Sequence, residues 1–142
     1  MSSQKSPSKS NSTLEKIVKI NKECFTSDDY YSSIENIKGY PYLTVKLDGE
    51  LVGYIIYNEY EGHLESLRRA LTAKARGKGL GIKLTKKLIT IANKKGKSVY
   101  TYVSKTNLPS LNSNLKCGYR IEDISEDWVY IRYKGKKNAK KA

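Results

Sequence analysis

A cluster of glycines constrains this chain more than any other feature. Residues 73–84 read AKARGKGLGIKL, with three glycines in five residues, and afterwards Leu84, Leu88 and Ala92 recur at helical spacing. Since glycine costs about 1 kcal/mol relative to alanine inside a helix, a helix that starts on this sequence needs the glycines for its turn. A strand is expected before the turn, over 63–71. Such a strand–turn–helix unit presents backbone N–H groups and a positive helix end to an anion.

Two familiar nucleotide-binding signatures do not fit this turn. A P-loop requires G-x-x-x-x-G-K-S/T, a spacing that is absent here. A dinucleotide-binding fingerprint requires G-x-G-x-x-G within a strand–helix–strand unit, whereas Gly77, Gly79 and Gly81 alternate with other residues after an expected hairpin. From the turn alone, a tight connection that holds no ligand remains an alternative.

Length and composition favour one globular domain. The 142 residues suffice for a domain with a core, expected over 13–134 between two disordered tails, the polar residues 1–12 and the Lys-rich residues 135–142. No apolar stretch is long enough to span a bilayer, and the polar N-terminus lacks a secretory signal. Cys24 and Cys117 have neither metal-binding nor disulfide-framework spacing, which favours reduced thiols in a cytoplasmic protein without a metal.

Charge is divided unevenly along the chain. The net charge is +13, and between Ser66 and Ile121 fourteen basic residues occur without an acidic one. Between Glu23 and Glu65 the balance inverts, with nine acidic residues against two lysines. A strongly basic chain suggests a polyanionic partner such as nucleic acid. The split into an acidic and a basic half suggests that the two halves meet different ligands.

The apolar patterns and turn residues predict an order of elements typical of an α/β (α+β) fold. Thr13 is a candidate N-cap for the first helix, and Gly39 with Pro41 ends the second. Helices are expected over 13–25, 28–37, 79–95 and 108–117, and strands over 42–47, 51–60, 63–71, 98–104, 118–123 and 127–133.

Two motifs flank the strand predicted over 98–104. The residues Arg76-Gly77-Lys78-Gly79-Leu80-Gly81 match the pattern Q/R-x-x-G-x-G/A. The segment from Asn107 to Tyr119, which contains Ser110, Lys116 and Gly118, matches N-x-x-S/A followed by K-x-G-F/Y. Together and in this order, the motifs resemble those of the GNAT superfamily of N-acetyltransferases. The resemblance runs from about Thr13 to Tyr133 and is specific within 63–119.

The resemblance implies a mixed, mostly antiparallel, twisted sheet flanked by helices, in which two central strands splay apart. It also implies acetyl-CoA as co-substrate, without a metal, and with the pantetheine arm in the gap between those strands. Backbone groups of Leu71 and Ala73 are expected to pair with the pantetheine, and the Leu71 N–H to polarise the thioester carbonyl. The remaining contacts are expected from Arg76, Gly77, Lys78, Gly79, Leu80 and Gly81 to the pyrophosphate, and from Asn107, supported by Ser110, to the pantetheine.

A base must remove a proton from an acceptor amine, because an ammonium group has no lone pair. Strand alternation predicts His63, Glu65, Leu67, Arg69 and Leu71 on one face. By resemblance, Glu65 occupies the position of the glutamate base of histone-type members, and His63 resembles the strand histidines of some arylalkylamine-type members. A surface carboxylate for Glu65 and an exposed structural role for His63 remain alternatives.

The chain departs from the family pattern in two places. Many members carry a tyrosine seven residues after the motif asparagine, which protonates the leaving thiolate, whereas this chain has Asn114 there. No general acid is therefore assigned, and Asn114 and Ser110 are expected only as contacts near the thiol. The family usually opens with a strand, but residues 1–12 are too polar for a good one. That strand is expected to be either a short edge strand or missing.

The resemblance implies an amine acceptor, bound where the N-terminal helices meet the ends of the first strands. This part of the chain is acidic and would suit a small cationic amine or a protein amine, acetylated by direct attack in a ternary complex. Its candidate contacts are Asp28, Asp29, Tyr30, Tyr31, Glu59 and Glu61. The alternative is a nucleic-acid-associated GNAT-like protein, either a base-modifying enzyme or a basic binding module that uses the basic face or the tails. A monomer or a homodimer is expected.

Overall fold

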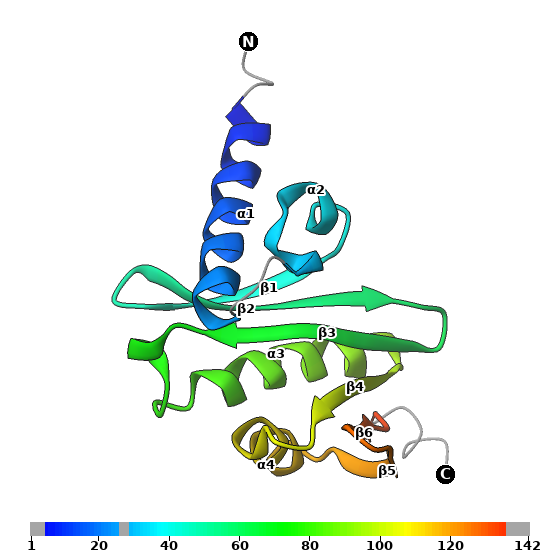
Figure 1. Cartoon of the computed structure of the whole chain (residues 1–142). Helices are drawn as coiled ribbons and strands as arrows, with labels where there is room; N and C mark the ends of the chain where they lie inside the picture. Colours follow the sequence, from blue (N-terminus) through cyan, green and yellow to red (C-terminus); the bar gives the residue numbers. More distant parts are fainter. Residues whose placement is uncertain (1–4, 26–28, 136–142) are drawn as a thin grey trace.

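The chain forms a six-stranded sheet with helices on both faces (Figure 1). The computed structural model describes residues 5–25 and 29–135, with side chains from residue 12 onward. Its elements are α1 (Lys5–Cys24), η2 (Tyr30–Ser32), α2 (Ile34–Ile37), β1 (Tyr42–Leu47), β2 (Glu50–Glu59), β3 (His63–Leu71), η3 (Ala73–Ala75), α3 (Leu80–Lys95), β4 (Ser98–Ser104), α4 (Leu108–Lys116), β5 (Arg120–Ile124) and β6 (Trp128–Tyr133). The predicted order of helices and strands and the mixed α/β class are confirmed.

The sheet has the strand order β1-β2-β3-β4-β6-β5. In the described sheet, β3 and β4 pair in parallel and the other neighbouring strands are antiparallel. Helices α1 and α2 lie on one face of the sheet, and α3 and α4 lie on the other (Figure 1). The predicted mixed, mostly antiparallel sheet flanked by helices is therefore confirmed.

Two apolar cores hold these layers together. The core under α3 contains Leu84 and Leu88 of the helix and Val99 of β4, and the core under α1 contains Ile17 and Tyr54. All five side chains are fully buried, and each apolar side chain of this size contributes about 1.5–3 kcal/mol on burial. No helix in the described residues is both long and apolar enough to cross a membrane.

The N-terminal region differs from the prediction. Helix α1 begins at Lys5, within the segment expected as a tail, so Thr13 is not its N-cap. Instead of one helix over 28–37, the chain forms η2 and α2, and the Asp29 carboxylate caps η2 by accepting from the Tyr31 N–H at 2.9 Å. Asp28 and residues 136–142 lie outside the described residues. The described residues before β1 contain no strand, so the expected opening strand is missing from them.

A register shift in β3 changes which side chains share a face. Ile56 pairs with Arg68 and Tyr57 pairs with Ser66, so Leu67 is an extra residue in a β-bulge. Leu67 packs with the core under α1, whereas Leu71 packs with the core under α3. The prediction that alternate residues from 63 to 71 share one face is therefore wrong, because the alternation restarts at the bulge.

Gly53 of β2 provides a test of how closely β2 and β3 pack. A Cβ atom there would overlap Leu71 Cδ2 and lie 3.0 Å from the Ala70 carbonyl oxygen. We therefore expect Gly53→Ala to lower the free energy of unfolding in urea by about 1–3 kcal/mol through overpacking. Gly62→Ala, where a Cβ would meet nothing within 4 Å, is the matched control and should change it by less than about 0.5 kcal/mol. Equal stability of the two variants would contradict this description of the packing.

Candidate functional site

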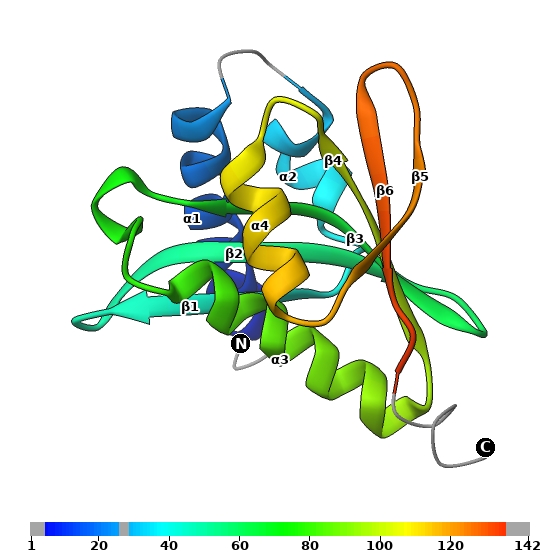
Figure 2. The same cartoon turned by 90° about the horizontal axis from the view of Figure 1, so that it is seen from below.

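The strands β3 and β4 separate partway along their length. They pair only over His63–Ser66 and Ser98–Thr101, and β4 then continues beside β6. Figure 2 shows the two strands diverging from their paired ends. A cleft of about 220 Å³ lies between the diverging strands and is also lined by residues of α4 and by Phe25. The expected splay of two central strands is therefore confirmed.

The cleft is electropositive. Arg68 and Arg69 of β3 both line it, and none of the described residues that line it is acidic. The predicted residues Asn107, Ser110 and Asn114 line it as well. Arg68 is paired with Asp29 outside the lining, whereas Arg69 has no carboxylate partner among the described residues. An unpaired cation in the cleft favours an anionic ligand or a group on which negative charge develops.

The backbone of β3 has groups that turn away from β2 at the edge of the cleft. The Thr72 N–H donates to the Val52 carbonyl at 2.9 Å, so the neighbouring Leu71 directs its N–H and C=O away from β2. Since β4 has already left β3 at this level, those groups face the open side. The Leu71 carbonyl accepts from the Cys24 thiol at 3.1 Å and from Arg76 Nε at 3.3 Å. A ligand that paired with this carbonyl would replace these two bonds.

Residues 73–81 form η3, the glycine turn and the start of α3. Gly77 and Gly79 have φ values of 76° and 79°, and Gly79 is the N-cap residue of α3. These left-handed conformations favour glycine, whereas a Cβ would meet nothing within 4 Å at either position. Lys78 between them is exposed, and the first turn of the 16-residue α3 carries no acidic residue. The N-terminal N–H groups of α3 therefore face a positive surrounding that suits an anion.

Arg69 joins the two segments that carry the sequence motifs. In α3 its guanidinium donates to the Gly81 carbonyl at 3.2 Å and to Thr85 Oγ1 at 2.7 Å. In α4 it donates to Ser110 Oγ at 3.3 Å and to Ser113 Oγ at 2.9 Å. Burial lowers the pKa of the guanidinium below its usual value, but arginine stays charged in proteins. Strand β3, helix α3 and helix α4 are thus linked beside the cleft.

The predicted residues of α4 form one polar group. Asn107 caps the helix by accepting from the Ser110 N–H at 3.3 Å. Asn114 is buried and donates to the Ser110 carbonyl at 2.9 Å. The structure thus brings Asn107, Ser110 and Asn114 together with Arg69, which the sequence analysis does not assign to the site.

Arg68 points to the opposite face, where it anchors the outer wall of the cleft. Its guanidinium lies 3.9 Å from the centroid of the Phe25 ring and 4.6 Å from that of Tyr31. It forms an ion pair with Asp29 at 2.9 Å and donates to Asn21 Oδ1 at 3.1 Å. Burial alone would raise the pKa of Asp29, but hydrogen bonds from Arg68 and Asn21 outweigh it and lower the pKa below its usual value.

The sequence does contain a signal for the two arginines. Adjacent residues of a strand point to opposite faces of the sheet. Because helices cover both faces, Arg68 and Arg69 must each place a cation between the sheet and a helix layer, one on each face. The nearest carboxylate before them is Glu65, and none follows before residue 122. Their partners therefore come from other elements, which the sequence does not identify.

The two predicted catalytic residues are not among the described residues that line the cleft. His63 is stacked between Tyr60 and Tyr100, with ring centroids 4.7 and 4.3 Å apart. Glu65 is half-buried and pairs with Tyr100 across β3 and β4. It directly precedes Ser66, which does line the cleft. Glu65 therefore lies one residue from the cleft wall.

Much of the acidic segment is paired with cations of the chain itself. Glu59 pairs with Lys95 at 2.8 Å and with Lys97 at 2.7 Å, and hydrogen bonds from these lysines lower its pKa to about 2. Asp29 is paired with Arg68. Asp29 and Glu59 are therefore neutralised within the chain, and their contact with a cationic acceptor remains a prediction.

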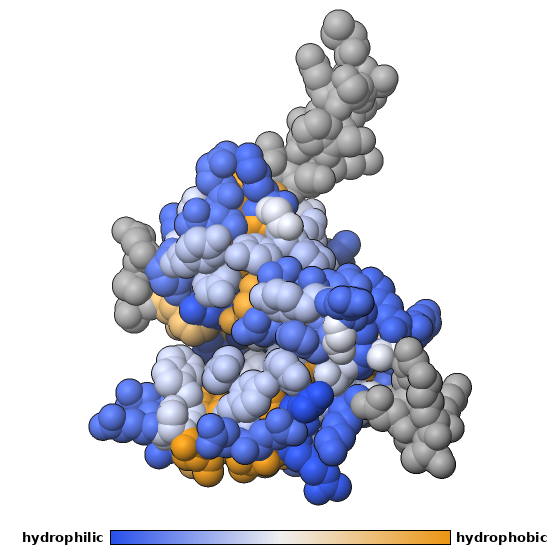
Figure 3. All heavy atoms as spheres, turned by 90° about the vertical axis from the view of Figure 1, so that its right-hand side faces the viewer, coloured by the Kyte–Doolittle hydropathy of each residue, from blue (hydrophilic) through white to orange (hydrophobic). Residues whose placement is uncertain are grey.

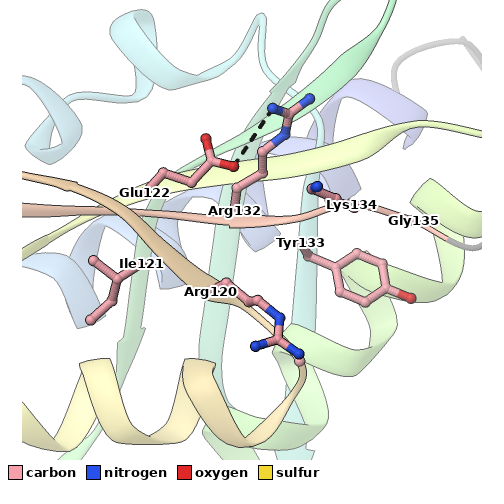
Figure 4. Close-up of a pocket in the computed structure, with 8 residues that line it drawn as sticks. Arg120, Ile121, Glu122, Arg132, Tyr133, Lys134 and Gly135 are labelled. Carbon is pink, nitrogen blue, oxygen red and sulfur yellow. Dashed lines mark ion pairs between the residues drawn. The ribbon is translucent and has the colours of Figure 1, made fainter. Parts of the chain in front are cut away.

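A second hollow of about 420 Å³ lies at the β5–β6 pair (Figure 4). Glu122 and Arg132 form an ion pair at 3.7 Å on one side of the strands, whereas Arg120 and Tyr133 point to the other side. It shares no lining residue with the cleft, and no predicted site residue lines it. The cleft between β3 and β4 is therefore the candidate functional site.

Comparison with known proteins gave a family match and similar solved structures. The model of the Acetyltransferase (GNAT) family matches residues 13–119. The PaiA N-acetyltransferase from Thermoplasma acidophilum in complex with coenzyme A has a similar structure, with 21% identity, a TM-score of 0.70, and coverage of 85% of this chain and 92% of that chain. For Ard1 from Thermoplasma volcanium the identity is 17%, the TM-score 0.74 and the coverage 86% and 90%. The ribosomal-protein-S18-alanine N-acetyltransferase from Escherichia coli has 14% identity and a TM-score of 0.71, and the match covers 82% of this chain and 85% of that chain.

At such identities the solved structures show a shared fold, and comparison with proteins of curated function gave no match. Neither the family match nor these structures support the alternative of a nucleic-acid-associated protein. Across residues 5–25 and 29–135, no group of three or more His, Cys, Asp or Glu side chains could hold a metal ion.

The ion pair of Arg68 and Asp29 makes a prediction about stability and pH. Because folding lowers the pKa of Asp29 from its usual 3.8, the pair stabilises the native state above about pH 4, and this contribution is lost as the pH falls through the lowered folded-state pKa. Asp29→Asn should lower the free energy of unfolding at pH 7 by about 1–3 kcal/mol, and the difference from wild type should shrink below pH 4. Urea unfolding across pH measures this.

Glu35→Gln is the control for that experiment. Glu35 forms an exposed pair with Lys38 at 2.9 Å, and the loss of an exposed pair costs less than about 1 kcal/mol. A difference between wild type and Asp29→Asn that stays constant down to the acid-unfolding range would contradict the role of the carboxylate charge.

Proposed function

The chain belongs to the GNAT acetyltransferase family, and on this premise we propose that it transfers the acetyl group of acetyl-CoA to the nitrogen of a cationic amine by direct attack in a ternary complex. Acetyl-CoA supplies the acetyl group as a thioester. The observation that carries the proposal is the cleft between β3 and β4, which has no acidic residue among its described lining and whose Arg69 donates to the Gly81 carbonyl at the start of α3.

The residues at the cleft fit this donor. Leu71 has backbone groups turned away from β2 and is proposed to pair with the pantetheine arm together with Ala73, which is exposed in η3. The turn from Arg76 to Gly81, with its basic side chains and helix N-terminus, is proposed to bind the pyrophosphate. Asn107 and Ser110 are proposed to contact the pantetheine from α4. This distribution also gives the basic half of the chain a ligand, since coenzyme A is a polyanion.

Aromatic and acidic side chains at the other end of the cleft support a cationic acceptor. Tyr102 and Trp128 line the cleft and are 57% and 51% exposed. The Lys105 N–H donates to the Asp127 carbonyl at 3.0 Å, which holds the β5–β6 turn next to the end of β4. The exposed carboxylates of Glu126 and Asp127 in this turn form no ion pair with the described residues. Aromatic faces flanked by free carboxylates attract cations.

Elsewhere along the same two strands, β4 and β6, a cation of the chain itself already lies against an aromatic ring. The Arg132 guanidinium lies 4.9 Å from the Tyr100 ring centroid, and Tyr100 and Tyr130 are in edge contact at 5.4 Å.

Figure 3 shows the side of the molecule on which the β2–β3 turn lies, with strongly hydrophilic residues around a paler central zone and hydrophobic residues along the lower edge. We propose that the acceptor reaches the cleft past Tyr102 and Trp128.

Glu65 is proposed as the base that receives the amine proton. Burial raises the pKa of Tyr31, Arg68 opposes this, and the nearby Glu65 carboxylate adds to the increase. Glu65 is therefore close to the wall formed by Arg68 and Tyr31, on the proposed acceptor side, and its neighbour Ser66 lines the cleft. His63 was a second candidate for this role, and its stacking between two tyrosine rings instead supports a part in holding the aromatic face.

Lys78 tests donor binding, because it is an exposed side chain between Gly77 and Gly79 in the turn. We expect Lys78→Glu to keep the free energy of unfolding within about 1 kcal/mol of wild type, since most substitutions of exposed side chains change it little. It should weaken acetyl-CoA binding about tenfold in isothermal titration, because a carboxylate in the turn repels the pyrophosphate. Lys94→Glu makes the same charge change at an exposed residue near the other end of α3 and should bind more like wild type. Equal affinity of both variants would contradict this location of the pyrophosphate.

The proposed reaction is tested by acetyl-CoA consumption with a panel of amines. Polyamines and lysine-containing peptides should be acetylated, and neutral amines of similar size should react more slowly. Glu65→Gln should lower kcat by about 10²–10⁴-fold, as expected for loss of a general base, with unchanged acetyl-CoA affinity. Glu15→Gln, at an exposed glutamate of α1, is the control and should retain activity. Background consumption with every amine would refute the proposal.

A further inference from the structure

Arg69 is a cation held among neutral groups. The four acceptors of its guanidinium are the Gly81 carbonyl and the hydroxyls of Thr85, Ser110 and Ser113. The side chain is half-buried and forms no ion pair with any described residue. A partly desolvated charge without a counter-charge attracts an anion that forms beside it.

Ser110 connects this charge to the cleft. Its Oγ accepts from Arg69 Nη2 at 3.3 Å and from Asn114 Nδ2 at 3.5 Å, and it donates to no described residue. The hydroxyl hydrogen is therefore available to a group in the cleft, which Ser110 lines. Because successive hydrogen bonds polarise one another, a hydroxyl that accepts from a guanidinium becomes a stronger donor.

Ser113 lies one turn along α4 and differs from Ser110 in its hydroxyl hydrogen, which is used within the helix, and in its position outside the cleft lining. Its Oγ accepts from the same Arg69 Nη2 at 2.9 Å, but it donates its own hydrogen to the Ser110 carbonyl at 3.0 Å. It is not among the described residues that line the cleft. The two serines therefore share the guanidinium, and Ser110 offers a free donor toward a ligand.

Asn114 indicates which part of the cleft would hold the sulfur of coenzyme A. By resemblance to the family, this position faces the leaving thiol, and many members place an acidic tyrosine there. Asn114 is buried, and its amide donates to the Ser110 carbonyl at 2.9 Å. Unlike a tyrosine, an amide cannot give up a proton to the sulfur near neutral pH. Negative charge on the sulfur must therefore be stabilised in another way.

We propose that Ser110 and Arg69 together stabilise the thiolate that forms when the acetyl group leaves coenzyme A. The inference rests on the proposed acetyl transfer. Glu65 first takes a proton from the ammonium form of the acceptor and releases it to solvent. The acceptor nitrogen then bonds to the acetyl carbon, the carbon–sulfur bond breaks with its electron pair on sulfur, and a second proton of the nitrogen passes to the proposed base Glu65. Ser110 acts as the donor to sulfur, and Arg69 is a positioning residue that acts through it. The N-terminus of the nine-residue α4 adds positive potential on the same side.

The thiol of bound coenzyme A reports on this role without turnover. Ultraviolet absorbance of the thiolate should give the bound thiol a pKa about one unit or more below that of the thiol of free coenzyme A, measured in the same way. Ser110→Ala should raise that pKa by about one unit. At a pH above the pKa of the free thiol, this change corresponds to a tenfold loss of coenzyme A affinity. Arg69→Met should have at least the same effect, and Arg69→Lys should restore part of it. Ser110→Ala should weaken the binding of desulfo-coenzyme A, which lacks the thiol, less than it weakens the binding of coenzyme A at that pH, and the difference reports the contact with sulfur.

Ser113→Ala is the matched control, because it removes another hydroxyl acceptor of the same guanidinium outside the cleft. It should change stability about as much as Ser110→Ala and leave the bound thiol unaffected. An unshifted thiol in the wild-type complex, or equal effects of the two serine variants, would overturn the inference and leave the proposed function intact. Absence of coenzyme A binding by wild type would overturn both. If Arg69→Met does not fold, the comparison of the two serine variants decides.

Discussion

The separation of β3 from β4 after four residue pairs is the constraint on which the rest of the site depends. Polar backbone groups inside a protein need partners, and a strand that loses its neighbour must find them elsewhere. The Leu71 carbonyl finds them in the Cys24 thiol and in Arg76. The end of α1 and the glycine turn are therefore both tied to the edge of the cleft, although they are far apart in the sequence.

The bulge at Leu67 determines what surrounds that cleft. Because it restarts the alternation of β3, Arg68 meets Asp29 and Asn21 under α1, and Arg69 meets α3 and α4. One arginine is neutralised by a carboxylate, and the other has neutral acceptors. The wall that contains Arg68 is therefore fixed by an ion pair, whereas the wall that contains Arg69 keeps a positive charge available to a ligand.

The distribution of charge along the chain has a different meaning in three dimensions from the one that it has in the sequence. The acidic segment is not a free negative surface, since Glu59 and Asp29 pair with cations of the basic half. The pair of Asp29 with Arg68 lies at a wall of the cleft, and none of the described residues that line the cleft is acidic. Besides Glu65, the unpaired acidic groups near the proposed acceptor end come from the β5–β6 turn, which lies far from the acidic segment in the sequence.

The sequence by itself determined the order and approximate bounds of the elements from β1 onward, the glycine turn with α3, and the motif residues of α4, because periodicity, caps and left-handed glycines are local properties. It did not determine which face each residue of β3 occupies, because a bulge depends on the register with β2. It also did not identify Arg69 or the pairing of Asp29 and Glu59. Those partners come from distant segments, and only the tertiary structure decides which charges remain unpaired.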